Sequence, residues 1–108
     1  MSARVVVLAS GSGTLFQSLI DSPHRGVDFE ICGLITDQPS AGAIARAEVA
    51  DIPHAVLPLA DFADRAAWDR GLADRLQSLR PELVVSAGFM RVLGSAVLDN
   101  FEGRIINT

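Results

Sequence analysis

Short apolar segments recur along the chain, separated by segments with helical periodicity. The apolar segments span residues 4–9, 29–36, 54–57, 83–87 and 104–108. Three of them are continuous apolar runs, which are typical of parallel strands buried on both faces. The hydrophobic pattern therefore predicts a parallel β-sheet.

The segments between these strands have the spacing of amphipathic helices. They span about residues 14–21, 41–50, 64–79 and 95–100. Ser40 is expected to cap the second helix, and the third carries an apolar stripe that Pro81 ends. The stripe consists of Trp68, Leu72, Leu76 and Leu79. The acidic residues near its start are interpreted as caps and solvated positions: Asp61, Asp64 and Asp69.

Strands and helices alternate in the order βαβαβαβαβ. This order predicts an α/β fold, a Rossmann-like parallel sheet with helices on both faces. No repeat, linker or change of composition divides residues 1–108, so we expect a single domain. Ligands of such sheets bind beyond the carboxyl ends of the strands, where the strand order reverses. The loops after the strands are therefore the places to look for a site.

The loop after the first strand is rich in glycine and hydroxyl groups. It reads Ser10-Gly11-Ser12-Gly13-Thr14 and runs directly into a helix. Free N–H groups and the helix dipole at such a loop favour a phosphate, although a tight turn alone also needs glycine. A nucleoside-triphosphate loop would need Lys after Gly13, where the chain has Thr14. A dinucleotide loop would need glycine in place of Phe16, but Asp37 stands near the position of a ribose-binding acid, so NAD remains a weaker alternative.

A second glycine-containing loop follows the fourth strand. Its sequence is Gly88-Phe89-Met90-Arg91-Val92-Leu93. These apolar residues either close the core or form an apolar slot for a flat aromatic ligand. Asn107 follows at the carboxyl end of the last strand, where it either donates to a developing oxyanion or simply ends the strand.

Composition and charge exclude several classes of partner. Apolar residues make up 49% of the 108-residue chain, and the formal net charge is −4. Because acidic and basic residues are interspersed, no basic patch indicates binding to nucleic acid or an anionic membrane. The single cysteine, Cys32, reads as a buried thiol, and His24 and His54 have no partner at metal-ligand spacing, so no metal is expected. Without a secretory signal or a long apolar run, a cytoplasmic location is favoured.

Three stretches together resemble the phosphoribosylglycinamide formyltransferase family. They are Val6-Val7-Leu8-Ala9-Ser10-Gly11-Ser12-Gly13, Ala87-Gly88-Phe89-Met90-Arg91-Val92-Leu93 and Gly103-Arg104-Ile105-Ile106-Asn107. The resemblance covers essentially the whole chain, and the Ala-Gly-Phe-Met-Arg run is its specific part. It implies transfer of a formyl group from 10-formyltetrahydrofolate, as co-substrate, to glycinamide ribonucleotide in purine biosynthesis.

The resemblance also implies roles for individual residues. The backbone of Gly13, Thr14 and Leu15 would hold the substrate phosphate. The folate-binding positions are Arg65, Met90, Arg91, Val92, Leu93 and Asn107, with Val97 and Leu98 as further lining of the pterin pocket. Asn107 would also be catalytic, because it matches the residue that contacts the formyl group and stabilises the tetrahedral intermediate. Thr14, Leu15 and Ser86 depart from the residues common in the family.

In this family the strand that carries the Asn continues to a catalytic His, and the chain stops at Thr108, one residue before that position. We therefore expect the N-terminal, phosphate-binding part of such an enzyme, without appreciable transformylase activity of the 108-residue chain alone. Two alternatives remain open, a formyltetrahydrofolate hydrolase-like enzyme and a non-catalytic Rossmann module that binds a nucleotide or phosphate. The last strand would form an unpaired apolar edge, so we also expect a homo-oligomer that associates through it.

Overall fold

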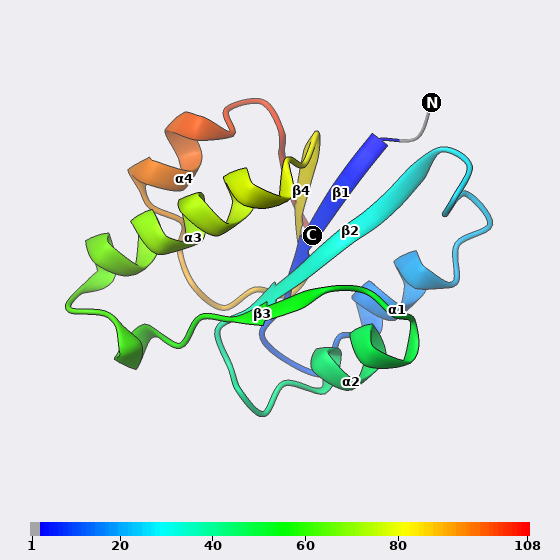
Figure 1. The fold of residues 1–108 in the computed structure, drawn as a ribbon, viewed down its shortest axis with the longest axis horizontal. Helices are drawn as coiled ribbons and strands as arrows, with labels where there is room; N and C mark the ends of the chain where they lie inside the picture. Colours follow the sequence, from blue (N-terminus) through cyan, green and yellow to red (C-terminus); the bar gives the residue numbers. More distant parts are fainter. Residues whose placement is uncertain (1–2) are drawn as a thin grey trace.

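Five parallel strands form the centre of the structure, a computed structural model that describes residues 3–108. The strands are β1 (Ala3–Leu8), β2 (Phe29–Thr36), β3 (His54–Val56), β4 (Leu83–Ser86) and β5 (Ile105–Asn107). They lie in the order β3-β2-β1-β4-β5, and every neighbouring pair is parallel (Figure 1). The predicted α/β fold with a parallel sheet is therefore confirmed.

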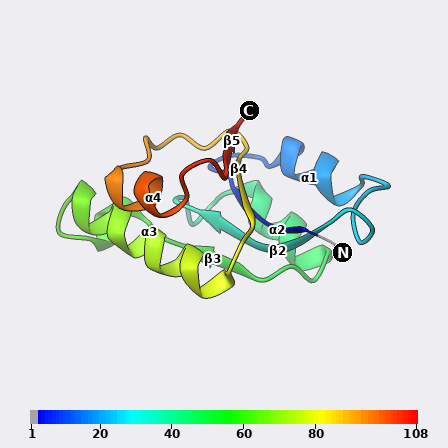
Figure 2. The same cartoon turned by 90° about the horizontal axis from the view of Figure 1, so that it is seen from above.

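Helices cover both faces of this sheet, as predicted. They are α1 (Thr14–Ile20), α2 (Gly42–Val49), α3 (Arg65–Leu79) and α4 (Ser95–Asn100), with a 3₁₀ turn, η1 (Leu59–Asp61), before α3. Helices α1 and α2 lie on one side of the sheet, and α3 and α4 lie on the other (Figure 2). The sequence pattern predicted each α-helix but not η1. None of the helices between residues 3 and 108 has the length and apolarity needed to cross a lipid bilayer.

Alternate residues of β1 point into two separate cores. Val5 and Val7 pack in the core beneath α1 and α2, whereas Val6 and Leu8 pack in the core beneath α3 and α4. All of these side chains are almost completely buried. Burial on both faces of the strand explains why its sequence is a continuous apolar run.

The apolar stripe of α3 faces the sheet, as predicted. Trp68, Leu72 and Leu76 are buried in the core that α3 shares with α4. Gly71 lies on the same helix, and a Cβ at this position would come within 2.6 Å of the Phe62 ring. The Phe62 ring thus occupies the space that a side chain at position 71 would need, which accounts for a glycine that weakens an isolated helix.

The two predicted helix caps have different outcomes. Asp64 caps α3, since its carboxylate accepts a hydrogen bond from the Ala67 amide at 2.8 Å. The prediction for Ser40 was wrong, because Ala41 precedes α2 and no side chain caps that helix. The Ala41 amide donates to the Gln38 carbonyl at 3.1 Å, so a turn carries the chain past Ser40 before the helix begins.

The strand order reverses at the boundary between β1 and β4. From β1 the chain proceeds through β2 to β3, and α3 then returns it to β4 and β5 on the other side of β1. The carboxyl ends of β1 and β4 therefore flank the crevice in which ligands of such sheets bind. Two loops leave the sheet there: residues 9–13, called the glycine loop below, and residues 87–94, called the second loop.

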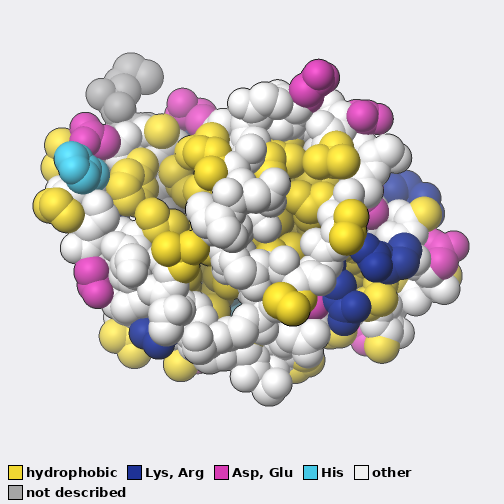
Figure 3. Space-filling model, turned by 180° about the vertical axis from the view of Figure 1, so that it is seen from behind, with side chains coloured by type: hydrophobic (Ala, Val, Ile, Leu, Met, Phe, Trp, Pro, Cys, Tyr) yellow, Lys and Arg dark blue, Asp and Glu magenta, His cyan; other side chains and the backbone are white. Residues whose placement is uncertain are grey.

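The two edges of the sheet are formed by β3 and β5. Figure 2 shows β3 and β5 on opposite sides of the molecule, and Figure 3 views the face that carries β5. Hydrophobic side chains gather on this face (Figure 3), and Ile106 of β5 is 46% exposed. The edge formed by β5 is therefore more apolar than an ordinary exposed edge strand.

Candidate functional site

The glycine loop has a shape that requires glycine at its last position. Gly13 precedes α1 with a φ of 77°, in the left-handed region. A Cβ on Gly13 would lie 2.7 Å from the Cβ of Ala43 in α2. The backbone conformation and the close approach of α2 therefore both exclude a side chain here.

Helix α2 donates hydrogen bonds to two carbonyl groups of the glycine loop. Arg46 Nε donates to the Ser12 carbonyl at 2.7 Å, and the Ala43 amide donates to the Gly11 carbonyl at 3.2 Å. The first N–H groups of α1 have no intrahelical acceptors, and a cavity of about 270 Å³, the loop cavity, opens beside them. It is lined by Gly11, Ser12, Gly13, Thr14, Leu15, Ala87, Gly88 and Thr108. The fold thus brings the predicted phosphate-binding positions together at one small cavity.

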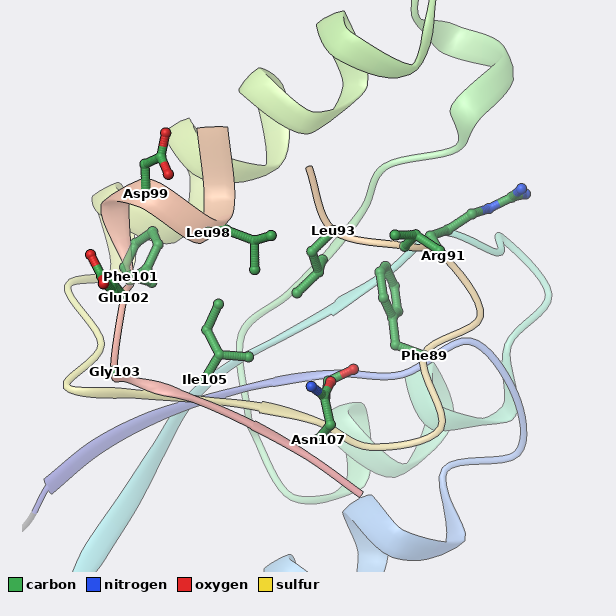
Figure 4. A pocket seen from close by; sticks show the side chains of 12 residues that line it. Phe89, Arg91, Leu93, Leu98, Asp99, Phe101, Glu102, Gly103, Ile105 and Asn107 are labelled. Carbon is green, nitrogen blue, oxygen red and sulfur yellow. The ribbon is translucent and has the colours of Figure 1, made fainter. Parts of the chain in front are cut away.

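A larger cavity of about 670 Å³, the main cavity, lies alongside β5 on the side of α4 and reaches the carboxyl ends of β4 and β5. Its apolar walls come from the second loop, α4 and β5, and they face one another in Figure 4. The apolar lining residues are Phe89, Val92, Leu93, Leu98, Phe101 and Ile105. Asn107 lies at one end of the cavity, and Asp99 and Glu102 lie at the other (Figure 4). This volume and lining suit a flat small molecule with a few polar groups.

The predicted folate-binding residues of the second loop are not all at the main cavity. Arg91, Val92 and Leu93 line it, but the Arg91 guanidinium points away from it (Figure 4). The Met90 side chain does not line the cavity and is 79% exposed. Instead, the Met90 amide donates to Ser10 Oγ at 2.8 Å. Successive residues of an extended loop point in different directions, so apolar character alone could not show which of them face the ligand.

Arg65, at the start of α3, lies at an adjoining cavity of about 460 Å³ that shares Val92 and Leu93 with the main cavity. Arg65 Nη2 donates to the Val92 carbonyl at 2.8 Å, and its guanidinium carbon lies 5.8 Å from the centre of the Trp68 ring. A positive charge is therefore held beside the main cavity, where it can attract an anionic part of a ligand.

Comparison with known proteins shows the family. Residues 3–108 match the family described as formyl transferase. The chain belongs to this family. The phosphoribosylglycinamide formyltransferase of Mycobacterium tuberculosis (strain H37Rv) is 42% identical over 106 residues, which cover 98% of this chain and 49% of that protein. The trifunctional purine biosynthetic protein adenosine-3 of Drosophila melanogaster is 36% identical over 107 residues, which cover 96% of this chain and 8% of that protein.

Solved structures of formyl transferases have the same fold. Glycinamide ribonucleotide transformylase 1 from Symbiobacterium toebii superposes with a TM-score of 0.93 at 34% identity, over 98% of this chain and 50% of that one. The chain thus spans about half the length of the phosphoribosylglycinamide formyltransferases that it matches. The predicted resemblance and the Rossmann-like formyl transferase fold are confirmed.

A buried carboxylate connects the glycine loop and the second loop. Asp37 follows β2 directly and is 2% exposed. Its Oδ1 accepts a hydrogen bond from Ser10 Oγ at 2.6 Å, and its Oδ2 accepts one from Arg91 Nε at 2.8 Å. Burial by itself raises the pKa of Asp37, but the hydrogen bonds from Ser10, Arg91 and Gln38 outweigh it and hold that pKa below its usual range. Because these partners engage both oxygens, Asp37 is not free to bind a ribose. No local pattern predicts the contact with Arg91, since 54 positions separate the two residues.

Another buried carboxylate places α4 beside the main cavity. Asp69 was expected at a cap or a solvated position, and the solvated position is wrong, because the residue is only 6% exposed. It accepts hydrogen bonds from the amides of Gly94, Ala96 and Val97 at 2.7, 2.8 and 3.3 Å. Of the two α4 residues expected to line the pterin pocket, Leu98 lines the main cavity, whereas Val97 is buried in the core.

The remaining titratable residues singled out in the sequence lie away from both cavities. His24 is exposed in the turn after α1, with Nδ1 2.6 Å from Asp28 Oδ2, and His54 is exposed at the start of β3. Burial raises the pKa of the Cys32 thiol, which donates to the Val5 carbonyl at 3.4 Å. Within the described part of the chain, no three His, Cys, Asp or Glu residues gather as metal ligands do.

Proposed function

We propose that this formyl transferase acts in the transfer of a formyl group from 10-formyltetrahydrofolate to glycinamide ribonucleotide. One observation carries the proposal. Asn107 and Thr108 are consecutive residues, and Asn107 lines the main cavity while Thr108 lines the loop cavity. A formyl donor in one cavity and a phosphorylated amine in the other would therefore meet at the end of β5. Similarity to phosphoribosylglycinamide formyltransferases over nearly the whole chain supports these two ligands.

The loop cavity offers what a phosphate monoester needs. The N–H groups at the start of α1 lie at the positive end of the helix dipole and have no acceptor within the helix. Gly13, Thr14 and Leu15 would bind the phosphate through their backbone. Binding by backbone groups explains how the chain tolerates Thr14 and Leu15 in place of the residues common in the family.

The main cavity offers a place for the pterin ring of the donor. Phe89 and Leu93 from the second loop face Leu98 and Ile105 across it (Figure 4). Apolar walls of this kind bury the faces of a flat ring, and a few polar groups then orient it. Arg65, beside the adjoining cavity, would attract the carboxylate end of the donor.

The chemistry itself would take place beside Asn107. The amine nitrogen attacks the formyl carbon, and the carbonyl electron pair moves to oxygen to form an oxyanion. The Asn107 amide would donate a hydrogen bond to this oxygen as its charge develops. When the intermediate collapses, the bond from the formyl carbon to the folate nitrogen breaks, the attacking amine loses a proton and the folate nitrogen gains one.

No imidazole of the described residues stands beside Asn107 to carry this proton. Among residues 3–108, His24 lies in the turn after α1 and His54 at the start of β3, so neither imidazole stands at the carboxyl ends of the strands. The carboxylates at the main cavity, Asp99 and Glu102, lie at the end opposite Asn107 (Figure 4). The 108-residue chain alone is therefore expected to bind both ligands without turnover above background.

Titration calorimetry with three ligands tests the proposal: glycinamide ribonucleotide, NAD and 10-formylfolate, a stable analogue of the donor. We expect the chain to bind the first and the third. NAD should not bind, because the buried Phe16 stands where a dinucleotide loop needs glycine. Binding of NAD alone would overturn the proposal. Release of formate from 10-formyltetrahydrofolate without an amine acceptor would instead favour the hydrolase-like alternative.

Two arginines of α3 provide a matched pair of variants for the donor site. Arg65→Ala should weaken binding of 10-formylfolate about tenfold, as expected for the loss of one charge-assisted hydrogen bond. Arg75→Ala removes an equal charge from the same helix at an exposed position that lines neither the main nor the adjoining cavity. It should leave the affinity unchanged. Equal losses in the two variants would show that Arg65 acts only through net charge.

The proposal includes self-association through β5 and a cytoplasmic location. An apolar cavity of about 300 Å³ lies beside β5 on the side of α1. It is lined by Ala3, Val5, Leu19, Phe29, Leu83, Val85, Ile106 and Thr108. Pairing of β5 with β5 of a second copy would satisfy the open edge and cover part of this surface. The single cysteine, half-buried and unable to form an internal disulfide, is consistent with a reducing compartment.

A further inference from the structure

We propose that Asp37 is a positioning residue for the formyl donor, because it fixes the second loop in the conformation that lines the main cavity. This inference rests on the proposed function only for the identity of the ligand. The position of the loop, and the role of Asp37 in holding it, are properties of this chain alone.

The middle of the second loop has few apolar contacts of its own. Met90 and Val92 are 79% and 77% exposed. Between the partly buried Phe89 and Leu93, each residue is instead held by one polar contact. The Met90 amide donates to Ser10 Oγ at 2.8 Å, Arg91 Nε donates to Asp37 at 2.8 Å, and the Val92 carbonyl accepts from Arg65 at 2.8 Å. The backbone path of the loop therefore depends on these three contacts.

Asp37 supports two of the three contacts. Its Oδ2 accepts from Arg91 directly, and its Oδ1 accepts the hydroxyl proton of Ser10 at 2.6 Å. Because the Ser10 hydroxyl donates its hydrogen bond to Asp37, the lone pairs of Ser10 Oγ are free to accept one from the Met90 amide. One carboxylate thus fixes the orientation of a hydroxyl and of a guanidinium, which in turn hold successive residues of the loop.

The location of Asp37 makes this a role in the site rather than in the core. The residue follows β2, and its side-chain partners, Ser10, Gln38 and Arg91, all lie in loops at the carboxyl edge of the sheet. The carboxylate is completely buried in the crevice between these loops, so its charge is little screened and its hydrogen bonds are correspondingly strong.

Amide hydrogen exchange and ligand binding, measured on the same variants, test the inference. Asp37→Ala removes the hydrogen bonds from Ser10, Arg91 and Gln38, and Asp37→Asn keeps the shape but removes the charge. We expect exchange of the Met90 amide to become about tenfold faster in Asp37→Ala and less so in Asp37→Asn, because an anchoring charged hydrogen bond is lost or weakened. Binding of 10-formylfolate should weaken to a similar extent, whereas exchange of Val6 and Val84 in the sheet should increase less than exchange of Met90.

Asp28→Asn is the control, because the Asp28 side chain pairs with the exposed His24 in the turn after α1, away from the second loop. It should change neither the Met90 exchange nor the affinity. Unchanged Met90 exchange in Asp37→Ala would overturn the inference, and so would an equal increase throughout β1 and β4, which would indicate a role in stability alone. If the unmutated chain does not bind 10-formylfolate, the proposed function fails. The Met90 amide then still reports whether Asp37 holds the loop.

Discussion

Ser86 and Asn107 are register partners on β4 and β5, and both line the main cavity. Alternate residues of a strand share a face, and Val84 and Ile105, two positions earlier, pack in the core beneath α3 and α4. The hydroxyl and the amide therefore stand side by side at the end of this face, where the sheet opens into the cavity. They form a polar end to a cavity whose walls are apolar.

Replacing Asn107 should remove a hydrogen bond to the formyl oxygen of the bound donor. In Asn107→Ala, the affinity for 10-formylfolate should fall roughly 2- to 10-fold, the effect of one hydrogen bond. The formyl carbonyl stretch of the bound ligand should move to higher frequency in the infrared difference spectrum, because the carbonyl is no longer polarised. Ser86→Ala, which removes the neighbouring hydroxyl, is the control and should shift the band less. An unchanged band in Asn107→Ala would exclude contact with the formyl group.

A methyl group at Gly13 should abolish phosphate binding and destabilise the fold. Gly13→Ala places a Cβ 2.7 Å from Ala43 and forces alanine into the left-handed region. The backbone strain alone costs about 1–3 kcal/mol, and the clash with α2 adds to it. Denaturant unfolding and calorimetry with glycinamide ribonucleotide measure the two effects.

Gly26→Ala is the matched control for Gly13→Ala. Gly26 also has a positive φ, of 84°, but a Cβ there would meet nothing within 4 Å. This variant should show the cost of strain without the clash, and it should bind glycinamide ribonucleotide normally. If the two variants lose equal stability, the contact between the glycine loop and α2 is looser than the geometry indicates.

The fold was predictable because a strand that is buried on both faces has a continuous apolar sequence. The valine run of β1, Val5-Val6-Val7, has no polar position, and the structure buries it between two layers of helices. Gly13 was likewise predictable as part of a strand–turn–helix loop. Element boundaries were less so, because a local turn decided that α2 begins after Ala41 rather than after Ser40.

The hydrogen bonds that hold the site loops in place were not predictable, because they join residues that are distant in the sequence. Asp37 meets Arg91 across 54 positions, and Asp69 meets Gly94 across 25. At the sequence level, each of these acids looks like an ordinary polar residue at the end of a strand or on a helix. Only the tertiary path shows that they are buried and satisfied. Met90 illustrates the converse, since its apolar side chain indicated a cavity wall and the loop turns it outward.

Asp37 should make the free energy of unfolding depend on pH in the acid range. A carboxyl whose pKa is lower in the folded state stabilises the fold above its unfolded pKa, about 3.9, and this stabilisation disappears as the pH falls through the folded pKa. Urea unfolding between pH 3 and 7 should therefore show a loss of stability below about pH 4. Asp37→Asn should be less stable at neutral pH and lose less on acidification. Parallel curves for the two proteins would contradict this.

Self-association through β5 should depend on concentration and on Ile106. Light scattering at high protein concentration should give a mass above that of the monomer. Ile106→Lys places a charge on the apolar edge and should restore the monomer. Val49→Lys, at an 88% exposed position on α2, should not. A monomeric mass for the unmutated chain at high concentration would rule out this mode of association.

Removal of the Asp69 carboxylate should cost more than removal of an ordinary helix cap. Asp64→Ala deletes one exposed hydrogen bond to the Ala67 amide and should lower the unfolding free energy by about 1 kcal/mol.

In Asp69→Ala, the amides of Gly94, Ala96 and Val97 lose their acceptor at a buried position, so the loss should be larger, about 2–3 kcal/mol. Because α4 carries Leu98 on the wall of the main cavity, binding of 10-formylfolate should weaken as well, whereas Asp64→Ala should leave it unchanged. Equal stability of the two variants would mean that water or a shift of α4 replaces the carboxylate.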